Sequence, residues 1–124
     1  MDIQISAGDL QVRGTLTDNP TSRSFAALLP LTLLVRDFEG TQRVADLPVR
    51  LDETGAPKVY RAMPGDITYF APWGNLALFY GAGTFTGGLI RLGTLDPDDL
   101  ATLFALRGET TITAISSFGP AAVE

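Results

Sequence analysis

Apolar and polar residues alternate with a period of two over most of the chain. This alternation, interrupted by turns rich in glycine, proline and aspartate, predicts eight strands. The predicted strands cover residues 3–5, 10–16, 31–35, 42–47, 66–71, 75–80, 89–95 and 110–115. Most of them are joined by short turns, which are typical of antiparallel hairpins. The middle of the chain has no helical period, so a parallel sheet covered by helices is not expected.

Two segments have the period and the opening residues of a helix. Asn-Pro at 19–20 precedes the first, residues 21–29, and Asp-Pro at 96–97 precedes the second, residues 98–106. Asparagine and aspartate accept hydrogen bonds from the first N–H groups of a helix, and proline suits its first turn. Both dipeptides therefore predict the start of an α-helix.

The two helices are too short to be stable without a sheet beneath them. At 3.6 residues per turn, Phe25 and Leu28 share one apolar face, and Leu103 and Phe104 share another. We expect Leu28 and Phe104 to plug the two ends of a barrel. The predicted fold class is therefore mainly β: a closed eight-stranded antiparallel β-barrel capped by two short helices, in a single domain of residues 1–124.

Composition excludes several classes of function. The chain has nine Lys and Arg, fourteen Asp and Glu, a net charge of −5, and neither histidine nor cysteine. Nucleic acid is not an expected partner, because binding to phosphates requires clustered cations. A Ser-His-Asp triad, a thiolate nucleophile, a disulfide and a nitrogen or sulfur metal site are all impossible. The acidic runs lack the spacing of a calcium loop, and we expect no metal and no cofactor.

No part of the sequence predicts a membrane segment. The first residues carry no basic region followed by an apolar one, as a secretory signal would. The longest apolar stretch, residues 25–35, is interrupted by Pro30 and is too short to span a bilayer. We expect a cytoplasmic protein with no membrane association.

The densest group of aromatic and amide side chains lies between residues 69 and 80. Tyr69, Trp73, Asn75 and Phe79 surround a Pro-Trp-Gly turn. They could form a concave binding wall, or the phenylalanines could fill the barrel core while Trp73 covers one end. An exposed aromatic rim is also typical of a contact between copies of a homo-oligomer.

Arginines and a glycine-rich run are the other candidates for ligand contact. Arg36, Arg61 and Arg91 could hold an anionic or amide ligand, because a guanidinium donates to two acceptors at once. The run GAGTFTGG, residues 81–88, lacks the Gly-Lys-Ser/Thr end of a phosphate loop and leads into a strand. It is predicted to be a flexible loop on the barrel rim.

Several segments resemble the cyclophilins. GTLTDNPTSRSFAALLP at 14–30 and LIRLGTLDPDDLATLFALRG at 89–108 are similar to the two strand-to-helix segments of that fold. DNPTSRSFAALLP, PGDITYFAPWGNLALFYG and IRLGTL are similar to segments of a bacterial and archaeal family described only as cyclophilin-like. The resemblance covers nearly the whole chain and implies an eight-stranded barrel with two helices.

Cyclophilins are peptidyl-prolyl isomerases, and the resemblance implies which residues to compare. Their catalytic arginine follows a Phe-His pair, but this chain has no histidine and Leu33 stands at the matching position, with Arg36 nearby. Phe79 matches the phenylalanine of their hydrophobic pocket. Their ligand-contacting tryptophan falls at Thr84 and Phe85, where this chain has none.

We therefore expect a cyclophilin-like domain that binds a small molecule or a peptide at an aromatic pocket on the side of the barrel. The catalytic arginine signature is missing, and the alternative is a weak peptidyl-prolyl cis-trans isomerase. The candidate binding residues are Trp73, Asn75, Phe79, Tyr69, Arg36, Phe85 and Arg91.

Overall fold

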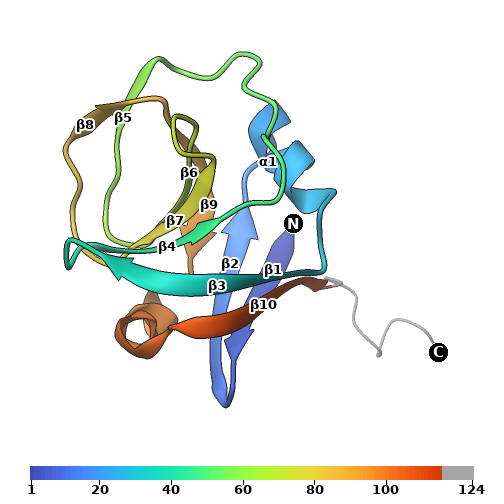
Figure 1. The fold of residues 1–124 in the computed structure, drawn as a ribbon, viewed down its shortest axis with the longest axis vertical. Helices are drawn as coiled ribbons and strands as arrows, with labels where there is room; N and C mark the ends of the chain where they lie inside the picture. Colours follow the sequence, from blue (N-terminus) through green and yellow to red (C-terminus); the bar gives the residue numbers. More distant parts are fainter. Residues whose placement is uncertain (116–124) are drawn as a thin grey trace.

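The computed structural model describes residues 1–115, which form a closed β-barrel with one α-helix and one 3-10 helix (Figure 1). The first half of the chain contains β1 (Asp2–Ala7), β2 (Leu10–Leu16), α1 (Pro20–Ala26), β3 (Leu31–Phe38), β4 (Gln42–Asp46) and β5 (Val59–Arg61). The second half contains β6 (Asp66–Phe70), β7 (Asn75–Phe79), β8 (Phe85–Gly87), β9 (Leu89–Leu95), the 3-10 helix η1 (Pro97–Ala105) and β10 (Gly108–Ile115).

Eight strands close the barrel in the order β1-β10-β3-β4-β7-β6-β9-β2, and each neighbouring pair is antiparallel. The predicted mainly β class and the eight-stranded barrel are confirmed. The expected flexible rim loop at 81–88 is wrong in part, because residues 85–87 are strand β8. This strand pairs with β5, and the two form a separate antiparallel ribbon.

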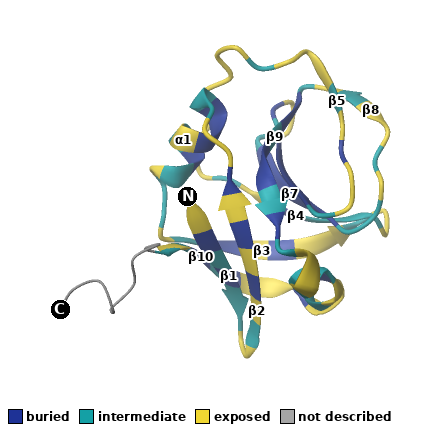
Figure 2. Ribbon diagram, turned by 180° about the vertical axis from the view of Figure 1, so that it is seen from behind, coloured by how far each residue is buried: buried dark blue, intermediate teal, exposed yellow. Residues whose placement is uncertain are grey.

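Apolar side chains that alternate along the strands fill the barrel interior. Ile3, Ile5 and Val12 point into it from β1 and β2 and are almost completely buried. In Figure 2, β2 accordingly alternates between buried and exposed residues along its length. Water therefore covers the outer face of this part of the barrel.

Strand β7 is different, because all five of its residues are buried. Leu76 and Leu78 belong to the interior core, whereas Ala77 and Phe79 belong to a second apolar cluster, together with Val44 of β4. Ala62, directly after β5, and Leu89 of β9 complete the buried part of this second cluster. The barrel thus has a second apolar layer on one part of its outer face, beneath the β5–β8 ribbon.

Helix α1 begins where the sequence predicts but is shorter than expected. The Ser22 N–H donates to Asn19 Oδ1 at 2.8 Å, which confirms the predicted N-cap. The Ser22 hydroxyl donates to the Leu92 carbonyl at 2.7 Å, and Phe25 is fully buried. These contacts hold α1 on β9. Leu28 lies beyond the end of the helix and is only partly buried against the core.

The second helix is a 3-10 helix, and this corrects the expected position of Phe104. A 3-10 helix has three residues per turn, so Leu100, Leu103 and Leu106 come onto one face. Leu103 and Leu106 are fully buried, whereas Phe104 is 59% exposed. Its ring lies 4.7 Å from that of Tyr80, outside the barrel end that it was expected to plug.

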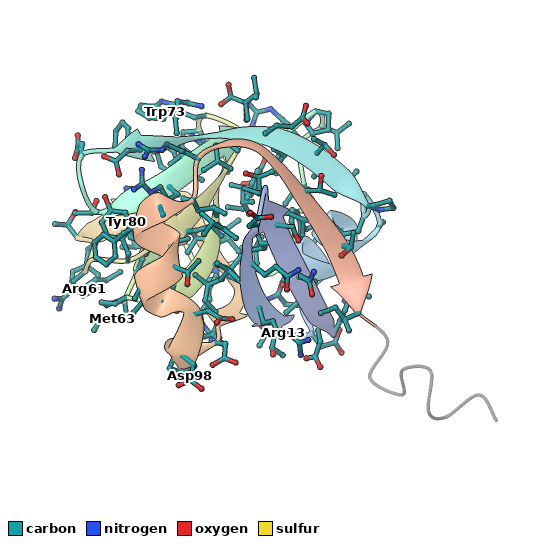
Figure 3. All side chains as sticks on the ribbon, turned by 90° about the horizontal axis from the view of Figure 1, so that it is seen from below. Arg13, Arg61, Met63, Trp73, Tyr80 and Asp98 are labelled. Atoms are coloured by element: carbon teal, nitrogen blue, oxygen red, sulfur yellow. The ribbon has the colours of Figure 1, made fainter. Side chains whose placement is uncertain are left out.

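Side-chain hydrogen bonds tie both ends of η1 to the barrel. The backbone N–H of Arg13 donates to Asp99 Oδ2 at 2.9 Å near the beginning of the helix. Arg43 of β4 donates through Nε to the Leu103 carbonyl at 3.1 Å and through Nη2 to the Phe104 carbonyl. Figure 3 shows Tyr80 beside this helix, and Figures 1 and 2 show α1 on the opposite side of the barrel.

Candidate functional site

A cavity of about 270 Å³ opens on the outer face of the barrel, where the second apolar layer lies. Its floor comes from β4 and β7, which supply Val44 and Phe79. The end of β3, the end of β6 and the segment around β8 form its walls. The cavity therefore exists because β4, β7 and the β5–β8 ribbon overlap without filling the space between them.

Trp73 stands at the mouth of this cavity. The residue belongs to the turn between β6 and β7 and is 59% exposed. Its ring packs edge-on against Phe38 and Phe70, with ring centroids 5.5 Å and 5.3 Å apart, respectively. Figure 3 shows Trp73 at the outer surface, well away from η1. The sequence-predicted Trp73, Asn75 and Phe79 all line the cavity.

Asn75 is the most deeply buried polar residue of the cavity lining. It is the first residue of β7, lies on the same strand face as Ala77 and Phe79, and is only 2% exposed. Its Oδ1 accepts no hydrogen bond from any described residue. Buried polar atoms are nearly always paired, so an unpaired one beside a cavity requires an explanation.

The other predicted site residues lie elsewhere. Tyr69 points into the barrel interior, where its hydroxyl accepts a hydrogen bond from the Leu51 N–H at 3.3 Å. Arg36 forms an ion pair with Asp46 at 3.5 Å beside a separate groove along β3. Phe85 is 75% exposed on the ribbon and, like Arg91, does not line the cavity.

The other large apolar side chains of the lining are Phe38, Val44, Phe70 and Leu89. Sequence reasoning missed three of them, and Phe70 lies within the aromatic group at 69–80 but was not among the candidate binding residues. These four side chains come from four strands, and only the register of the barrel brings them together. One signal was available: the run after Asn75 is apolar at four consecutive positions. Such a run is typical of a strand buried on both faces, and it would have indicated a second layer outside the barrel.

A buried carboxylate fastens the β5–β8 ribbon beside the cavity. Asp66 Oδ2 accepts hydrogen bonds from the Tyr60 hydroxyl at 2.6 Å and from the Met63 N–H at 2.9 Å. Arg91 Nε donates to Asp66 Oδ1 at 3.3 Å. Burial and the neighbouring Asp66 carboxylate raise the pKa of Tyr60 to about 12. The phenol therefore stays protonated and holds β5 onto β6.

Tyr60 is expected to make the folded state less stable at alkaline pH. The stability of the chain is expected to stay nearly constant from about pH 6 to pH 9, because it has no histidine or cysteine. The raised pKa of Tyr60 adds stability that is fully present below its unfolded value of 10 and is lost as the pH rises towards about 12. Measured by urea unfolding across this range, the free energy of unfolding should fall less steeply with pH in Tyr60→Phe than in wild type. Equal slopes for the two proteins would contradict this role.

A second carboxylate, that of Asp37, joins β3 to Arg43 of β4 and to Tyr80 at the end of β7. The Tyr80 hydroxyl donates to Asp37 Oδ1, and Arg43 lies 3.4 Å from the same oxygen. The Tyr80 hydrogen bond, with help from the Gly40 N–H and Arg43, lowers the pKa of Asp37. Because Arg43 also binds the carbonyls of η1, these contacts support the 3-10 helix and stand apart from the cavity lining.

Within residues 1–115, no helix has the length and apolar character needed to cross a membrane. The same residues bring together no group of three or more carboxylates able to hold a metal ion.

Comparisons with known proteins agree with this architecture. A hypothetical protein, AF2241 from Archaeoglobus fulgidus, has a solution structure that aligns with a TM-score of 0.71 and 15% identity, over 93% of this chain and 95% of that one. McbB in complex with tryptophan aligns with a TM-score of 0.61 and 15% identity, over 93% of this chain and 46% of that one. At such identities the likeness shows the fold alone.

No curated protein matches the chain in sequence. The model of a family described as the cyclophilin-like family, however, matches residues 5–114, nearly the whole length of the barrel. Together with the closed barrel and its two helices, this match identifies the chain as a member of the cyclophilin-like family.

Proposed function

We propose that this chain is a binding module that takes a small apolar molecule, or one apolar side chain of a peptide, into the outer-face cavity. The observation that carries this proposal is the convergence of four aromatic residues on one open cavity: Phe38, Phe70, Trp73 and Phe79. Sites for small ligands are usually concave and lined by aromatic and apolar side chains with few polar groups.

The size of the cavity limits what it could hold. Its volume of about 270 Å³ lies just below the roughly 300–1,000 Å³ of ordinary ligand pockets. A ligand of one or two rings suits that space better than a long substrate does. A longer peptide would place a single side chain in the cavity and lie across the exposed Trp73.

The lining favours binding over catalysis. Glu39 is the one ionisable residue among the described residues that line the cavity. Acid–base catalysis needs a positioned proton donor or acceptor with a matched pKa, and a single exposed carboxylate at the rim supplies no such pair. The alternative of a weak prolyl isomerase gains no support from Arg36, because this arginine pairs with Asp46 outside the cavity.

Calorimetric titration with N-acetyl-L-phenylalaninamide tests the proposal, because this probe carries one ring and two peptide-like amides. Wild type is expected to bind it, and Trp73→Ala to bind about two- to tenfold more weakly, since aromatic contacts contribute roughly 0.5–1.5 kcal/mol. L-tryptophan is a reasonable second probe, because McbB has been solved in complex with it.

Phe85→Ala is the matched control for this titration. Phe85 is also an exposed aromatic residue, but it lies outside the cavity lining. Its removal should leave the affinity unchanged. Undetectable binding by wild type at millimolar probe, or an equal loss in both variants, would overturn the proposal.

A further inference from the structure

The Asn75 side-chain amide occupies a position that the fold itself does not explain. Its backbone pairs with Phe70 on one side and with Asp46 on the other, so the strand register already fixes β7. The side chain is buried on the outer face of β7, yet Oδ1 finds no donor among residues 1–115. An apolar residue of similar size would pack there without this cost.

The cavity around Asn75 is walled mainly by aromatic and apolar side chains. The hydroxyl and amide groups that also line it, on Thr41, Gln42, Thr84 and Thr86, make no hydrogen bond to its Oδ1. Trp73 packs edge-on against Phe38 and Phe70 at the mouth of the cavity, and Val44 and Phe79 lie along its floor. No lysine or arginine is among the lining residues of the described chain, and Glu39 puts a negative charge at the rim. An anionic ligand would be repelled there and would find no cation with which to pair.

We propose that Asn75 determines the specificity of the cavity, and that its ligand is an uncharged aromatic N–H heterocycle whose N–H donates to Asn75 Oδ1. The inference rests on the proposed function, because it requires the cavity to bind a ligand at all. The flat ring would lie between the aromatic walls, and its single donor would satisfy the unpaired Oδ1 of Asn75. A bicyclic ring system fits within the volume of about 270 Å³.

Indole and benzofuran form a matched pair of probes for this proposal. They have almost the same shape, but an oxygen replaces the N–H group in benzofuran, so it cannot donate. Amide NMR titrations of the full chain should show indole binding about tenfold more tightly, because leaving a buried acceptor unpaired costs on the order of one power of ten in affinity. A preference below about twofold, or a preference for benzofuran, would overturn the role of Asn75.

Asn75→Leu removes the acceptor while keeping a side chain of similar size. It should bind the two probes equally, whereas the control Phe85→Ala should keep the preference of wild type. If Asn75→Leu does not fold, the side-chain amide resonance of Asn75 in wild type provides a second measurement. It should shift further with indole than with benzofuran, because the two rings have similar ring currents and only indole adds the hydrogen bond. Equal shifts would contradict the hydrogen bond.

These titrations also separate the two proposals from each other. Equal binding of both probes at the cavity would overturn only the donor requirement at Asn75. Failure of both probes to shift the amides of Val44, Asn75 and Phe79 would overturn the cavity as a binding site, and the inference with it.

Discussion

Gly93→Ala is expected to lower the free energy of unfolding by at least about 3 kcal/mol, because a side chain at this position would collide with backbone. A Cβ on Gly93 would lie 2.0 Å from the Thr15 carbonyl oxygen and 2.8 Å from the Leu16 Cα. Neither atom can rotate away as a side chain could. The ladder between β2 and β9 is short, from Gly14 opposite Leu95 to Leu16 opposite Gly93, and it closes the barrel.

Gly87→Ala is the matched control, since Gly87 also lies in a strand. The nearest atom to a Cβ there is the Lys58 carbonyl oxygen at 3.8 Å, an ordinary contact. This variant should stay within about 0.5 kcal/mol of wild type in urea unfolding. Similar losses in the free energy of unfolding for the two variants would show that β2 and β9 do not pack closely at Gly93.

Leu103→Ala should lower the free energy of unfolding by about 2–5 kcal/mol, whereas Phe104→Ala should lower it by less than about 1 kcal/mol. The two neighbours differ in burial because η1 turns every three residues. Leu103 is completely buried in the core, and Phe104 rests on Tyr80 at the surface. The comparison is informative because an α-helical period would place both side chains on the same apolar face.

Urea unfolding of the two variants measures this difference directly. Leu100 is the internal reference, because it is only partly buried against the same core. Its alanine variant should fall between the other two. A loss for Phe104→Ala as large as that for Leu103→Ala would mean that the ring plugs the barrel after all.

Local patterns predicted the barrel well, because its strands alternate and its helices begin at recognisable caps. Asn19 and Asp96 act at these caps through their own side chains, so a few neighbouring residues suffice to predict them. The 3-10 geometry of η1 could not be predicted in this way. Leu100, Leu103 and Phe104 fit a helical stripe equally well at 3.6 residues per turn, and tertiary contacts through Arg43 hold the observed form.

The ribbon was missed for a different reason. Strands β5 and β8 have three residues each and pair across a long stretch of chain, with Val59 opposite Gly87. Neither strand is long enough to display an alternation. The contacts that hold them include Tyr60 to Asp66, whose partner belongs to the barrel strand β6 and is not recognisable from the ribbon residues alone.

Only the part of the candidate site that lies within one continuous segment was predicted from the sequence. Trp73, Asn75 and Phe79 lie within seven consecutive positions, so their proximity follows from the sequence. Tyr69 was grouped with them, but strand alternation turns it to the interior. The remaining walls come from strands whose order in the barrel does not follow their order in the chain, and local patterns carry no information on that order.

The ribbon also links the stability of the fold to the cavity. It covers part of the outer face of β7, and residues 82–84 together with Thr86 form one wall of the cavity. Asp66 anchors β5, and β5 in turn pairs with β8. The shape of the cavity therefore depends on a buried polar contact that lies outside its lining.

The most direct test of this account is the location of a bound probe. Intermolecular nuclear Overhauser effects between N-acetyl-L-phenylalaninamide and the isotopically labelled chain report which side chains the phenyl ring touches. We expect contacts to the methyl groups of Val44 and Leu89 and to the ring of Phe79, all of which line the cavity. Contacts confined to Leu34 and Leu47 in the groove along β3, or no contacts at all, would contradict it.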